Sequence, residues 1–223
     1  MHIGMIGGIG PAATDFYYQR LITNFAKRGK ALELTMVHAD SPTLIANLAS
    51  NDTAAQVTIY KRLADRLAAA GAGCVVVTSI GGHFCIKEFE AVSPLPVINM
   101  LTEVERAVTA KGLKRIGIMG TRTVMETKFY GSFSQTEVVP PQGDLLDHVH
   151  DAYVTMATAG YVTSEQRQVF DTACEQFLQR DQVEAILLGG TDLALVYDSE
   201  TCDFPLVDGA AIHVNAITEA ANR

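Results

Sequence analysis

Short apolar runs alternate with longer amphipathic stretches along the chain. Apolar runs of about four to eight residues, bounded by Gly, Pro or polar residues, are typical of buried strands. We expect eight strands, at Ile3–Gly8, Leu32–His38, Cys74–Thr78, Val97–Met100, Ile116–Gly120, Thr136–Val139, Ala185–Leu188 and Leu206–Val207.

Helical patterns fill the intervals between these strands. Pro11 suits a first helical turn, where its missing N–H would have no helical partner. From Asp52 to about Ala70, apolar residues recur at helical spacing. Further helices are expected at Glu103–Ala110, Val124–Phe133, Leu145–Ala159, Ser164–Gln179 and Ala210–Asn222. Nearly uninterrupted apolar strands that alternate with helices predict an α/β fold with parallel sheets covered on both faces.

The chain also repeats itself weakly. "IGMIGG" at Ile3–Gly8 recurs as "IGIMGT" at Ile116–Thr121, "CVVVTS" as "AILLGG", and "PVIN" as "PLVD", each at a spacing of about 110 residues. Three pairs in the same order predict two pseudo-symmetric lobes, each a small parallel sheet flanked by helices. We expect residues 1–97 and 209–223 in the N-terminal lobe and residues 98–208 in the other.

Small and hydroxyl residues gather where the strands end, in "GGIGPAAT", "TSIGGH", "GTRT" and "GGTD". Ligands of parallel sheets bind beyond the carboxyl ends of the strands, and exposed N–H groups and hydroxyls suit small anions. We therefore expect a small polar ligand in a cleft between the lobes. The predicted binding residues are Gly8, Gly10, Thr78, Gly81, Gly82, Thr121 and Gly190.

Composition narrows the class of protein. Of 223 residues, 48% are hydrophobic and 19% charged, which favours a well-buried globular chain. The net charge of -8 makes nucleic acid an unexpected partner. No apolar run approaches the roughly 18 residues of a membrane span, and "MHIGMIGG" lacks the basic start of a signal peptide. We expect a cytoplasmic protein without membrane association.

Two kinds of site are disfavoured by spacing. The four cysteines, at 74, 85, 174 and 202, form no CxxC pair, so we expect reduced thiols and no metal site. Gly8–Ala13 approaches a dinucleotide fingerprint, but Asp40 lies about thirty residues on rather than about twenty, and no Walker motif is present. A nucleotide site is therefore the less favoured alternative.

Ser79 and the histidines each have two interpretations. GxSxG would need Gly at Val77, so a capping or ligand-binding serine is favoured over a hydrolase nucleophile. His83, after a Gly pair, is either a packing residue or an acid/base. His148 and His150 are interpreted as structural or solvated. His213 is interpreted as a helix-surface residue, with a position facing the cleft as the alternative.

Five motifs in order resemble the aspartate/glutamate racemase superfamily. They are "IGMIGGIGPAATDFYYQRL", "GTRTVMETKFY", "HDAYVTMATAGYVTSEQR", "ILLGGTDLALV" and "PLVDGAAIHVNAI". The resemblance implies two pseudo-symmetric α/β lobes, no cofactor, an amino-acid or carboxylate ligand, and a homodimer, which is common in that superfamily.

The resemblance breaks at the two catalytic positions. Superfamily members use one cysteine from each lobe, in "CNTxH" and "GCTE", to remove and deliver the α-proton. Here Ser79 and Gly190 stand at those positions, with His83 at the motif histidine and Thr191-Asp192 after the glycine. Cys85 and Cys202 are the available displaced thiols. The loop "ADSPTLIANLASND" also lacks the basic residue of aspartate-specific members.

Two hypotheses follow. In the first, the chain is a cofactor-independent enzyme, a racemase-like isomerase or a diverged lyase or hydrolase, with Ser79, His83, Thr191 and Asp192 as working groups. In the second, it is a pseudoenzyme that binds a small carboxylate without chemistry. Standard two-cysteine racemisation is not expected in either.

Overall fold

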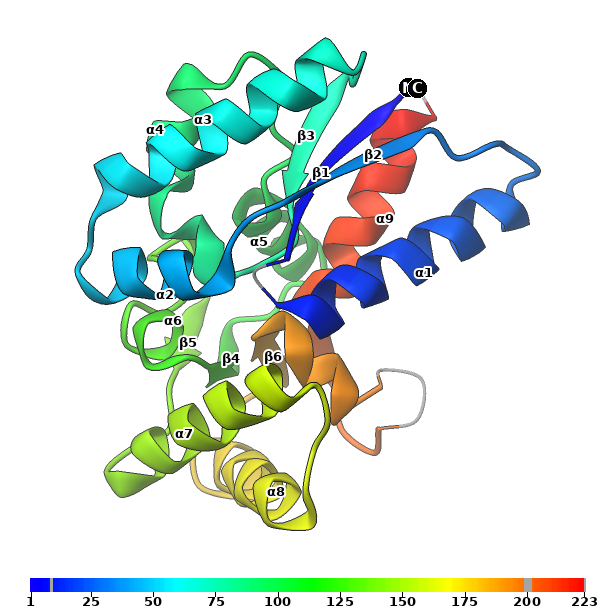
Figure 1. The fold of residues 1–223 in the computed structure, drawn as a ribbon. Coiled ribbons are helices and arrows are strands. Elements are labelled where there is room, and N and C mark those ends of the chain that lie inside the picture. Colours follow the sequence, from blue (N-terminus) through cyan, green and yellow to red (C-terminus); the bar gives the residue numbers. More distant parts are fainter. Residues whose placement is uncertain (9, 199–201, 223) are drawn as a thin grey trace. The chain divides into compact units, whose positions relative to one another are not determined.

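Parallel strands form two sheets in the computed structural model, which describes residues 1–8, 10–198 and 202–222 (Figure 1). One sheet has the strand order β2-β1-β3 and the other β5-β4-β6-β7. Contacts divide the chain into two compact units, unit 1 (Met1–Glu103 and Ala210–Arg223) and unit 2 (Val104–Gly209). The predicted α/β class with two parallel sheets is confirmed.

The unit 1 sheet is built from β1 (Ile3–Gly7), β2 (Leu34–His38) and β3 (Cys74–Val77). β1 lies in the middle and is buried throughout, whereas the edge strand β2 is partly exposed. A strand covered on both faces has no polar alternation, and the sequences of β1 and β3 are accordingly apolar.

The strand predicted at Val97–Met100 is wrong. The chain there makes a single parallel bridge between Val97 and Val75. The Asn99 side chain then accepts a hydrogen bond from the N–H of Leu101 at 2.9 Å, and α5 (Met100–Ala110) begins. Asn99 therefore starts a helix where the apolar run alone indicated a strand.

Two helices approach opposite faces of β1 through glycines. A Cβ at Gly4 would lie 3.1 Å from the Cβ of Leu67 in α3 (Thr53–Ala69), and a Cβ at Gly7 would lie 2.6 Å from the Cγ2 of Thr14 in α1 (Pro11–Lys27). Residues three apart on a strand face opposite ways.

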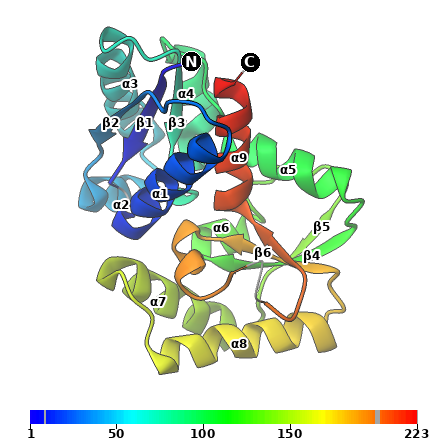
Figure 2. The same cartoon turned by 90° about the vertical axis from the view of Figure 1, so that its right-hand side faces the viewer.

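α1 and α9 (Gly209–Ala221) lie side by side (Figure 2). A hydrogen bond between the side chains of Asn24 and Asn215 joins them.

A helix that was absent from the predicted elements follows β2 in unit 1. The stretch expected to be a loop after β2 contains α2 (Ser41–Ala49), and the Asp40 carboxylate accepts a hydrogen bond from the N–H of Thr43 at 2.9 Å. An aspartate followed by proline in the first turn is a helix-start signal, which outweighed the polar residues around it.

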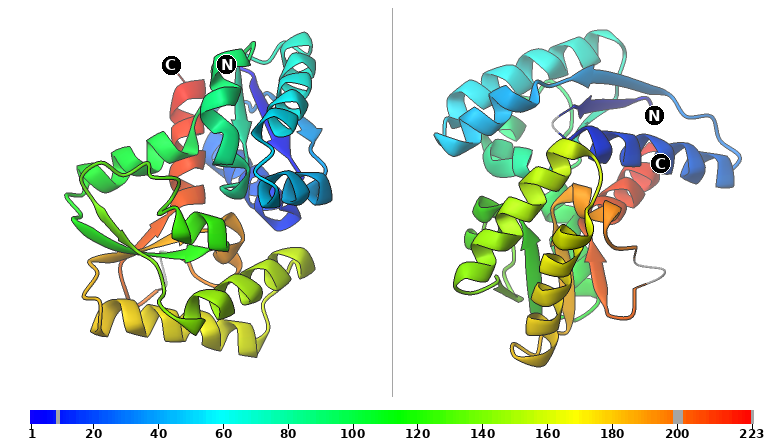
Figure 3. Two further views of the ribbon diagram at one scale, coloured as in Figure 1. Left: turned by 90° about the vertical axis from the view of Figure 1, so that its left-hand side faces the viewer. Right: turned by 60° about the horizontal axis from the view of Figure 1, so that its bottom comes forward.

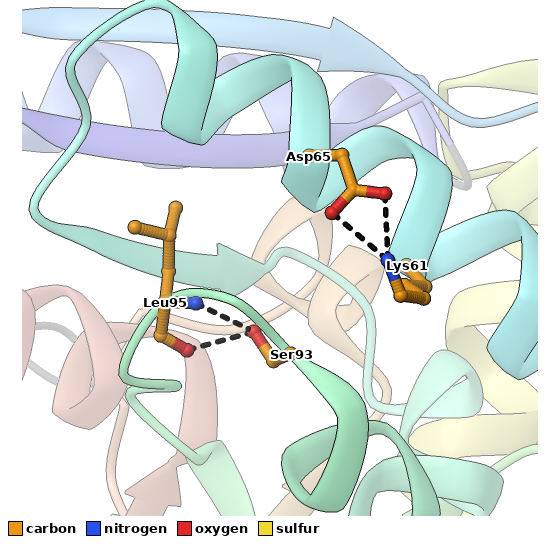
Figure 4. Close-up of polar contacts among 4 residues, drawn as sticks. All are labelled: Lys61, Asp65, Ser93 and Leu95. Carbon is orange, nitrogen blue, oxygen red and sulfur yellow. Dashed lines mark hydrogen bonds and ion pairs between the residues drawn. The ribbon is translucent and has the colours of Figure 1, made fainter.

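Local polar contacts occur within one helix of unit 1 and at the end of another (Figure 4). On α3, the ammonium of Lys61 pairs with the carboxylate of Asp65 one turn later, at 2.8 Å. After α4 (Ile86–Val92), the Ser93 hydroxyl donates to the carbonyl of Leu95 at 2.7 Å and accepts from its N–H at 3.2 Å. This turn closes the helix ahead of the Val97 bridge.

Unit 2 contains β4 (Arg115–Gly120), β5 (Glu137–Val139), β6 (Ala185–Gly189) and β7 (Leu206–Asp208). Two long helices, α7 (Asp144–Ala159) and α8 (Ser164–Gln179), pack together (Figure 3). A Cβ at Gly117 would lie 2.7 Å from the Phe177 ring, so this glycine lets α8 approach the sheet. α8 begins with a reciprocal capping box between Thr163 and Gln166.

The helix predicted at Val124–Phe133 is too long. α6 spans Arg122–Glu126, and Lys128, Phe129 and Tyr130 all have positive φ. The N–H of Phe129 bonds the carbonyl of Val124 at 2.8 Å, and the Phe129 side chain is fully buried. Burial of this ring holds the left-handed turn, which non-glycine residues otherwise avoid.

The two sheets repeat one arrangement. In each, the first strand lies between the second and the third, and the third strand leads into a short 3₁₀ helix, η1 (Gly81–Cys85) or η2 (Thr191–Leu195). The Val75–Val97 bridge corresponds to the pairing of β6 with β7. None of the helices in the described part of the chain combines the length and the apolar character that a membrane span requires.

Candidate functional site

The hydroxyl of Thr14 contacts three of the predicted binding residues, Gly8, Gly10 and Thr78, which follow β1 and β3. The Thr14 hydroxyl oxygen accepts from the N–H of Gly8 at 2.9 Å, lies 3.0 Å from the carbonyl of Gly10, and lies 3.3 Å from the Thr78 hydroxyl. Gly8 has φ +97°, and a Cβ there would lie 2.1 Å from Nδ1 of His38. The sequence did not single out Thr14, because helical threonines more often face solvent or bond their own helix.

His83 is buried with a defined tautomer. Its Nδ1 lies 2.6 Å from the carbonyl oxygen of Ser79, which can only accept, so the ring proton sits on Nδ1. Nε2 is buried and has no hydrogen-bond partner among the described residues. Burial lowers the pKa of His83 to about 4, against the opposing effect of the Ser79 carbonyl. The imidazole is therefore neutral at pH 7, with a lone pair on Nε2.

The Ser79 hydroxyl is not paired with that imidazole. It is 8% exposed and accepts a long hydrogen bond, 3.3 Å, from the N–H of Gly82. A Cβ at Gly81 would lie 3.6 Å from it, and the carbonyl of Gly82 accepts from the Tyr60 hydroxyl at 3.1 Å. Ser79, Gly81, Gly82 and His83 are thus neighbours in one turn, without the serine–histidine hydrogen bond of an activated nucleophile.

His213 is not on the helix surface, and that prediction is wrong. The residue is fully buried: its Nε2 bonds the carbonyl of Ile98 at 2.7 Å, and its Nδ1 lies 2.8 Å from the Tyr17 hydroxyl. Its ring stands edge-on to that of His83, with centroids 6.3 Å apart. Burial, and then the charge of a protonated His83, lower its pKa to about 3. The described part of unit 1 thus holds two neutral buried imidazoles side by side.

In unit 2, β4 and β6 end side by side. Gly120 pairs with Gly189, and a Cβ at Gly120 would lie 2.6 Å from the carbonyl oxygen of Gly189. Thr121, directly after β4, caps α6 by accepting from the N–H of Val124 at 3.4 Å. His150 accepts from the N–H of Arg122 at 3.1 Å, which gives it the structural role expected.

Directly after β6 come Gly190, Thr191 and Asp192. Beside them lies the side chain of Tyr153 from α7, which was not singled out from the sequence. The Tyr153 hydroxyl donates to Oδ2 of Asp192 at 3.0 Å, and both side chains are buried. A Cβ at Gly190 would lie 2.2 Å from Cε2 of Tyr153. Burial, and then the charge of Asp192, raise the pKa of Tyr153 well above its ordinary value, so the phenol keeps its proton.

Of the two candidate displaced thiols, Cys85 differs from a catalytic base. Cys85 is fully buried, and burial raises its pKa to about 12. Its sulfur donates to the carbonyl of Gly82 at 3.9 Å. A thiol of this pKa is not a thiolate at neutral pH. Cys202 is partly exposed. Across residues 1–8, 10–198 and 202–222, no three His, Cys, Asp or Glu side chains are grouped to hold a metal ion.

Solved structures that are similar to this chain are described as racemases or racemase homologues. The whole chain superposes on a putative Asp/Glu racemase from Yersinia pestis, covering 100% of both chains with TM-score 0.87 and 24% identity. It also superposes on an aspartate racemase homologue from Pyrococcus horikoshii OT3, covering 100% of this chain and 99% of that one (TM-score 0.82, 20% identity).

A third similar structure is the glutamate racemase of Francisella tularensis subsp. tularensis SCHU S4 in complex with D-glutamate. It matches 99% of this chain and 81% of that one, with TM-score 0.67 and 14% identity. At these identities the superpositions establish the fold. The family model for Asp/Glu/hydantoin racemases, however, matches residues 6–217, nearly the whole sequence. The chain therefore belongs to the Asp/Glu/hydantoin racemase family.

Proposed function

We propose that this protein binds a small amino acid or carboxylate at the carboxyl ends of its strands and acts on it without a cofactor, by chemistry other than two-thiol racemisation. Family membership supports the ligand class, and the Francisella relative holds D-glutamate. Ser79, His83, Thr191 and Asp192 are the proposed working groups. The N–H groups and hydroxyls around Gly8, Gly10, Thr78, Gly81, Gly82, Thr121 and Gly190 are proposed to bind the ligand.

The observation that carries this proposal is Nε2 of His83. A buried polar atom without a partner costs about 1–3 kcal/mol, so a fold that keeps one gains something from it. The Ser79 carbonyl fixes the tautomer and leaves Nε2 as an acceptor beside the turn that carries the Ser79 hydroxyl. A ligand with an N–H or O–H group directed at Nε2 would satisfy it.

The residues that stand at the two cysteine positions of the family are unsuited to removing and delivering the α-proton. Among the described residues, the contact of the Ser79 hydroxyl is with the N–H of Gly82 and not with a base, and Gly190 has no side chain. His83, with a pKa of about 4, is a weak base at neutral pH. These facts specifically favour the second candidate function, a pseudoenzyme that binds a small carboxylate or amino acid and transfers no proton.

Two measurements on the same samples separate these functions. Thermal shifts with amino acids and dicarboxylates measure binding, since a ligand at 100 times its Kd adds about 2.7 kcal/mol of stability. Proton NMR in D₂O measures hydrogen exchange at the α-carbon. Binding with exchange or a new product supports the enzyme. Binding without either supports the pseudoenzyme, and the absence of any binding contradicts both.

Matched substitutions test His83 directly. His83→Asn keeps an N–H near the Nδ1 position for the Ser79 carbonyl but removes Nε2, whereas His83→Gln places an amide near Nε2. We expect His83→Asn to weaken ligand binding by about tenfold, the value of one hydrogen bond, and His83→Gln to weaken it less. Equal affinities for the parent and His83→Asn would contradict a role for Nε2. The homodimer and the cytoplasmic location stay predictions, the first of which sedimentation equilibrium tests.

A further inference from the structure

A buried thiol and a buried tyrosine are hydrogen-bonded in unit 2. The Cys174 thiol, in α8, donates to the hydroxyl oxygen of Tyr197, shortly after η2, with sulfur and oxygen 3.5 Å apart. The Tyr197 hydroxyl donates in turn to the carboxylate of Asp171 at 2.6 Å. Cys174 is 3% exposed and Tyr197 7%, whereas Asp171 is solvent-exposed. Two hydrogen bonds therefore lead from an enclosed thiol to a carboxylate in contact with water.

A second thiol, that of Cys202, belongs to a segment that contacts the same tyrosine. The N–H of Cys202 donates to the carbonyl of Asp198, the residue after Tyr197, at 3.0 Å. Two residues after Cys202, the Phe204 ring stands edge-on to the Tyr197 ring, with centroids 5.6 Å apart. The chain at Cys202 is thus attached to Tyr197 and its neighbour, while the Tyr197 hydroxyl contacts Cys174.

The two thiols differ in their access to solvent. Cys202 is partly exposed, and Cys174 is buried. Burial chiefly, and then the charges of Asp171 and Cys202, raise the pKa of Cys174 to about 12, while the hydrogen bond to Tyr197 opposes this. Cys174 is therefore protonated at neutral pH and shielded, whereas Cys202 can meet an oxidant directly. A charge at Cys202 acts on Cys174 over a short distance, which agrees with the contacts around Tyr197.

Two neighbouring thiols can bind a soft metal ion or be oxidised together. A protein metal site of this kind needs at least three ligands. Within the part of the chain that the structure describes, no three His, Cys, Asp or Glu side chains are grouped to hold a metal ion. Oxidation needs only an accessible thiol and a second thiol to react with it, which is the arrangement of Cys202 and Cys174.

We propose that Cys202 and Cys174 form a redox-sensitive pair, which a peroxide converts to a disulfide. The peroxide transfers one oxygen to the Cys202 sulfur, which becomes a sulfenic acid, and hydrogen peroxide is thereby reduced to water. The Cys174 sulfur then attacks the Cys202 sulfur, so that the sulfur–sulfur bond forms, the sulfur–oxygen bond breaks and hydroxide departs. In total, two thiols and one hydrogen peroxide give one disulfide and two waters.

Tyr197 and Asp171 are positioning residues for the proton that Cys174 loses in the second step. As the sulfur attacks, the thiol proton passes to the Tyr197 oxygen, and the Tyr197 proton passes to Asp171. Asp171 then releases a proton to water, where it neutralises the hydroxide. This route lets a thiol that is protonated at neutral pH react as a nucleophile. The inference goes beyond the proposed function, because none of these side chains is among the proposed working or binding groups.

Peptide mapping of the parent protein tests the pair. Fully reduced protein is treated with an equimolar amount of hydrogen peroxide and unfolded, its remaining thiols are alkylated, and its peptides are analysed by mass spectrometry without reduction. We expect a link between the peptides that contain Cys174 and Cys202, the loss of two alkylated thiols, and recovery of both thiols with dithiothreitol. This measurement uses the native chain, so it does not depend on the folding of a variant.

Substitutions separate the two steps. Cys174→Ser should leave a sulfenic acid at Cys202 that dimedone traps, and Cys202→Ser should remove the fast reaction with peroxide. Tyr197→Phe should slow disulfide formation by at least about tenfold, the scale of assisted proton transfer, without slowing formation of the sulfenic acid. Cys85→Ser is the matched control and should leave the yield of the link unchanged, because Cys85 is also a buried thiol with a pKa of about 12.

Several results would overturn the inference. The pair is excluded if all thiols of the treated parent can still be alkylated, or if Cys202 is oxidised while Cys174 stays a free thiol. A link between the Cys202 residues of two chains excludes it as well. Equal rates of disulfide formation in the parent and in Tyr197→Phe overturn the role given to Tyr197. Ligand binding has no part in these measurements, so their outcome is independent of the proposed function.

Discussion

Replacing Gly190 with alanine tests whether Tyr153 fills the side-chain space of that residue. The added Cβ would lie 2.2 Å from Cε2 of the phenol ring, whereas real Cβ contacts are essentially never shorter than 3.0 Å. The ring would have to move by about 1 Å against a packed interior, and overpacking of this kind costs about 1–3 kcal/mol. Its hydrogen bond to Asp192 would weaken as well, adding about 1–2 kcal/mol. We therefore expect Gly190→Ala to destabilise the protein by about 2–5 kcal/mol.

Truncating the tyrosine should remove that cost. Tyr153→Ala alone should lower stability by about 3–5 kcal/mol, as truncation of a buried aromatic does. With the ring gone, the extended backbone of Gly190 accepts alanine without strain, and the substitution then becomes neutral or stabilises by up to about 1 kcal/mol. The coupling energy between the two sites is thus expected to be at least about 2 kcal/mol, well above the value for independent sites.

Urea titrations followed by circular dichroism measure the four corners of this cycle, and unchanged m values show that stability alone has changed. Gly189→Ala is the matched control. Its Cβ would lie 2.7 Å from the carbonyl oxygen of Met119, a backbone atom that Tyr153→Ala does not remove. Gly189→Ala should therefore cost the same in both backgrounds. Equal costs of Gly190→Ala with and without Tyr153 would refute the assignment of that space to the phenol.

Two further predictions concern pH and thiols. His83 and His213 have pKa values of about 4 and about 3 in the folded protein, below the 6.5 of an unfolded histidine. Their contribution to the stability of the fold is therefore complete above pH 6.5 and is lost as the pH falls toward 4 and 3. The free energy of unfolding, measured by urea titration, should therefore fall by about 2 kcal/mol per histidine between pH 7 and pH 5. In His83→Asn this total loss should be halved. An undiminished loss in that variant would exclude His83 as a cause. Native protein should react with a thiol reagent at Cys202, because Cys74, Cys85 and Cys174 are buried. A fast-reacting thiol in Cys202→Ser would contradict the protonated, enclosed state of Cys85.

The sequence by itself determined the fold class, the repeat and the family. Apolar runs, helical periodicity and glycine-ended strands are properties of contiguous residues, so they can be read along the chain. The resemblance in motif order likewise predicts that Ser79 and Gly190 stand at the two cysteine positions. The predicted elements were wrong where local signals conflicted. Asn99 starts a helix where a strand was predicted, and α6 ends before the buried ring of Phe129, earlier than the helix that was predicted there.

The tertiary structure alone decided what surrounds these two positions. Tyr17 and His213 lie 196 residues apart in the sequence, and Tyr153 and Asp192 lie 39 apart, yet each pair shares a hydrogen bond. Both tyrosines belong to apolar helix stripes, where periodicity indicates packing and says nothing of a hydroxyl's partner. The tautomer of His83 and the tyrosine beside Gly190 are fixed by contacts that form only when distant segments meet, which no local pattern encodes.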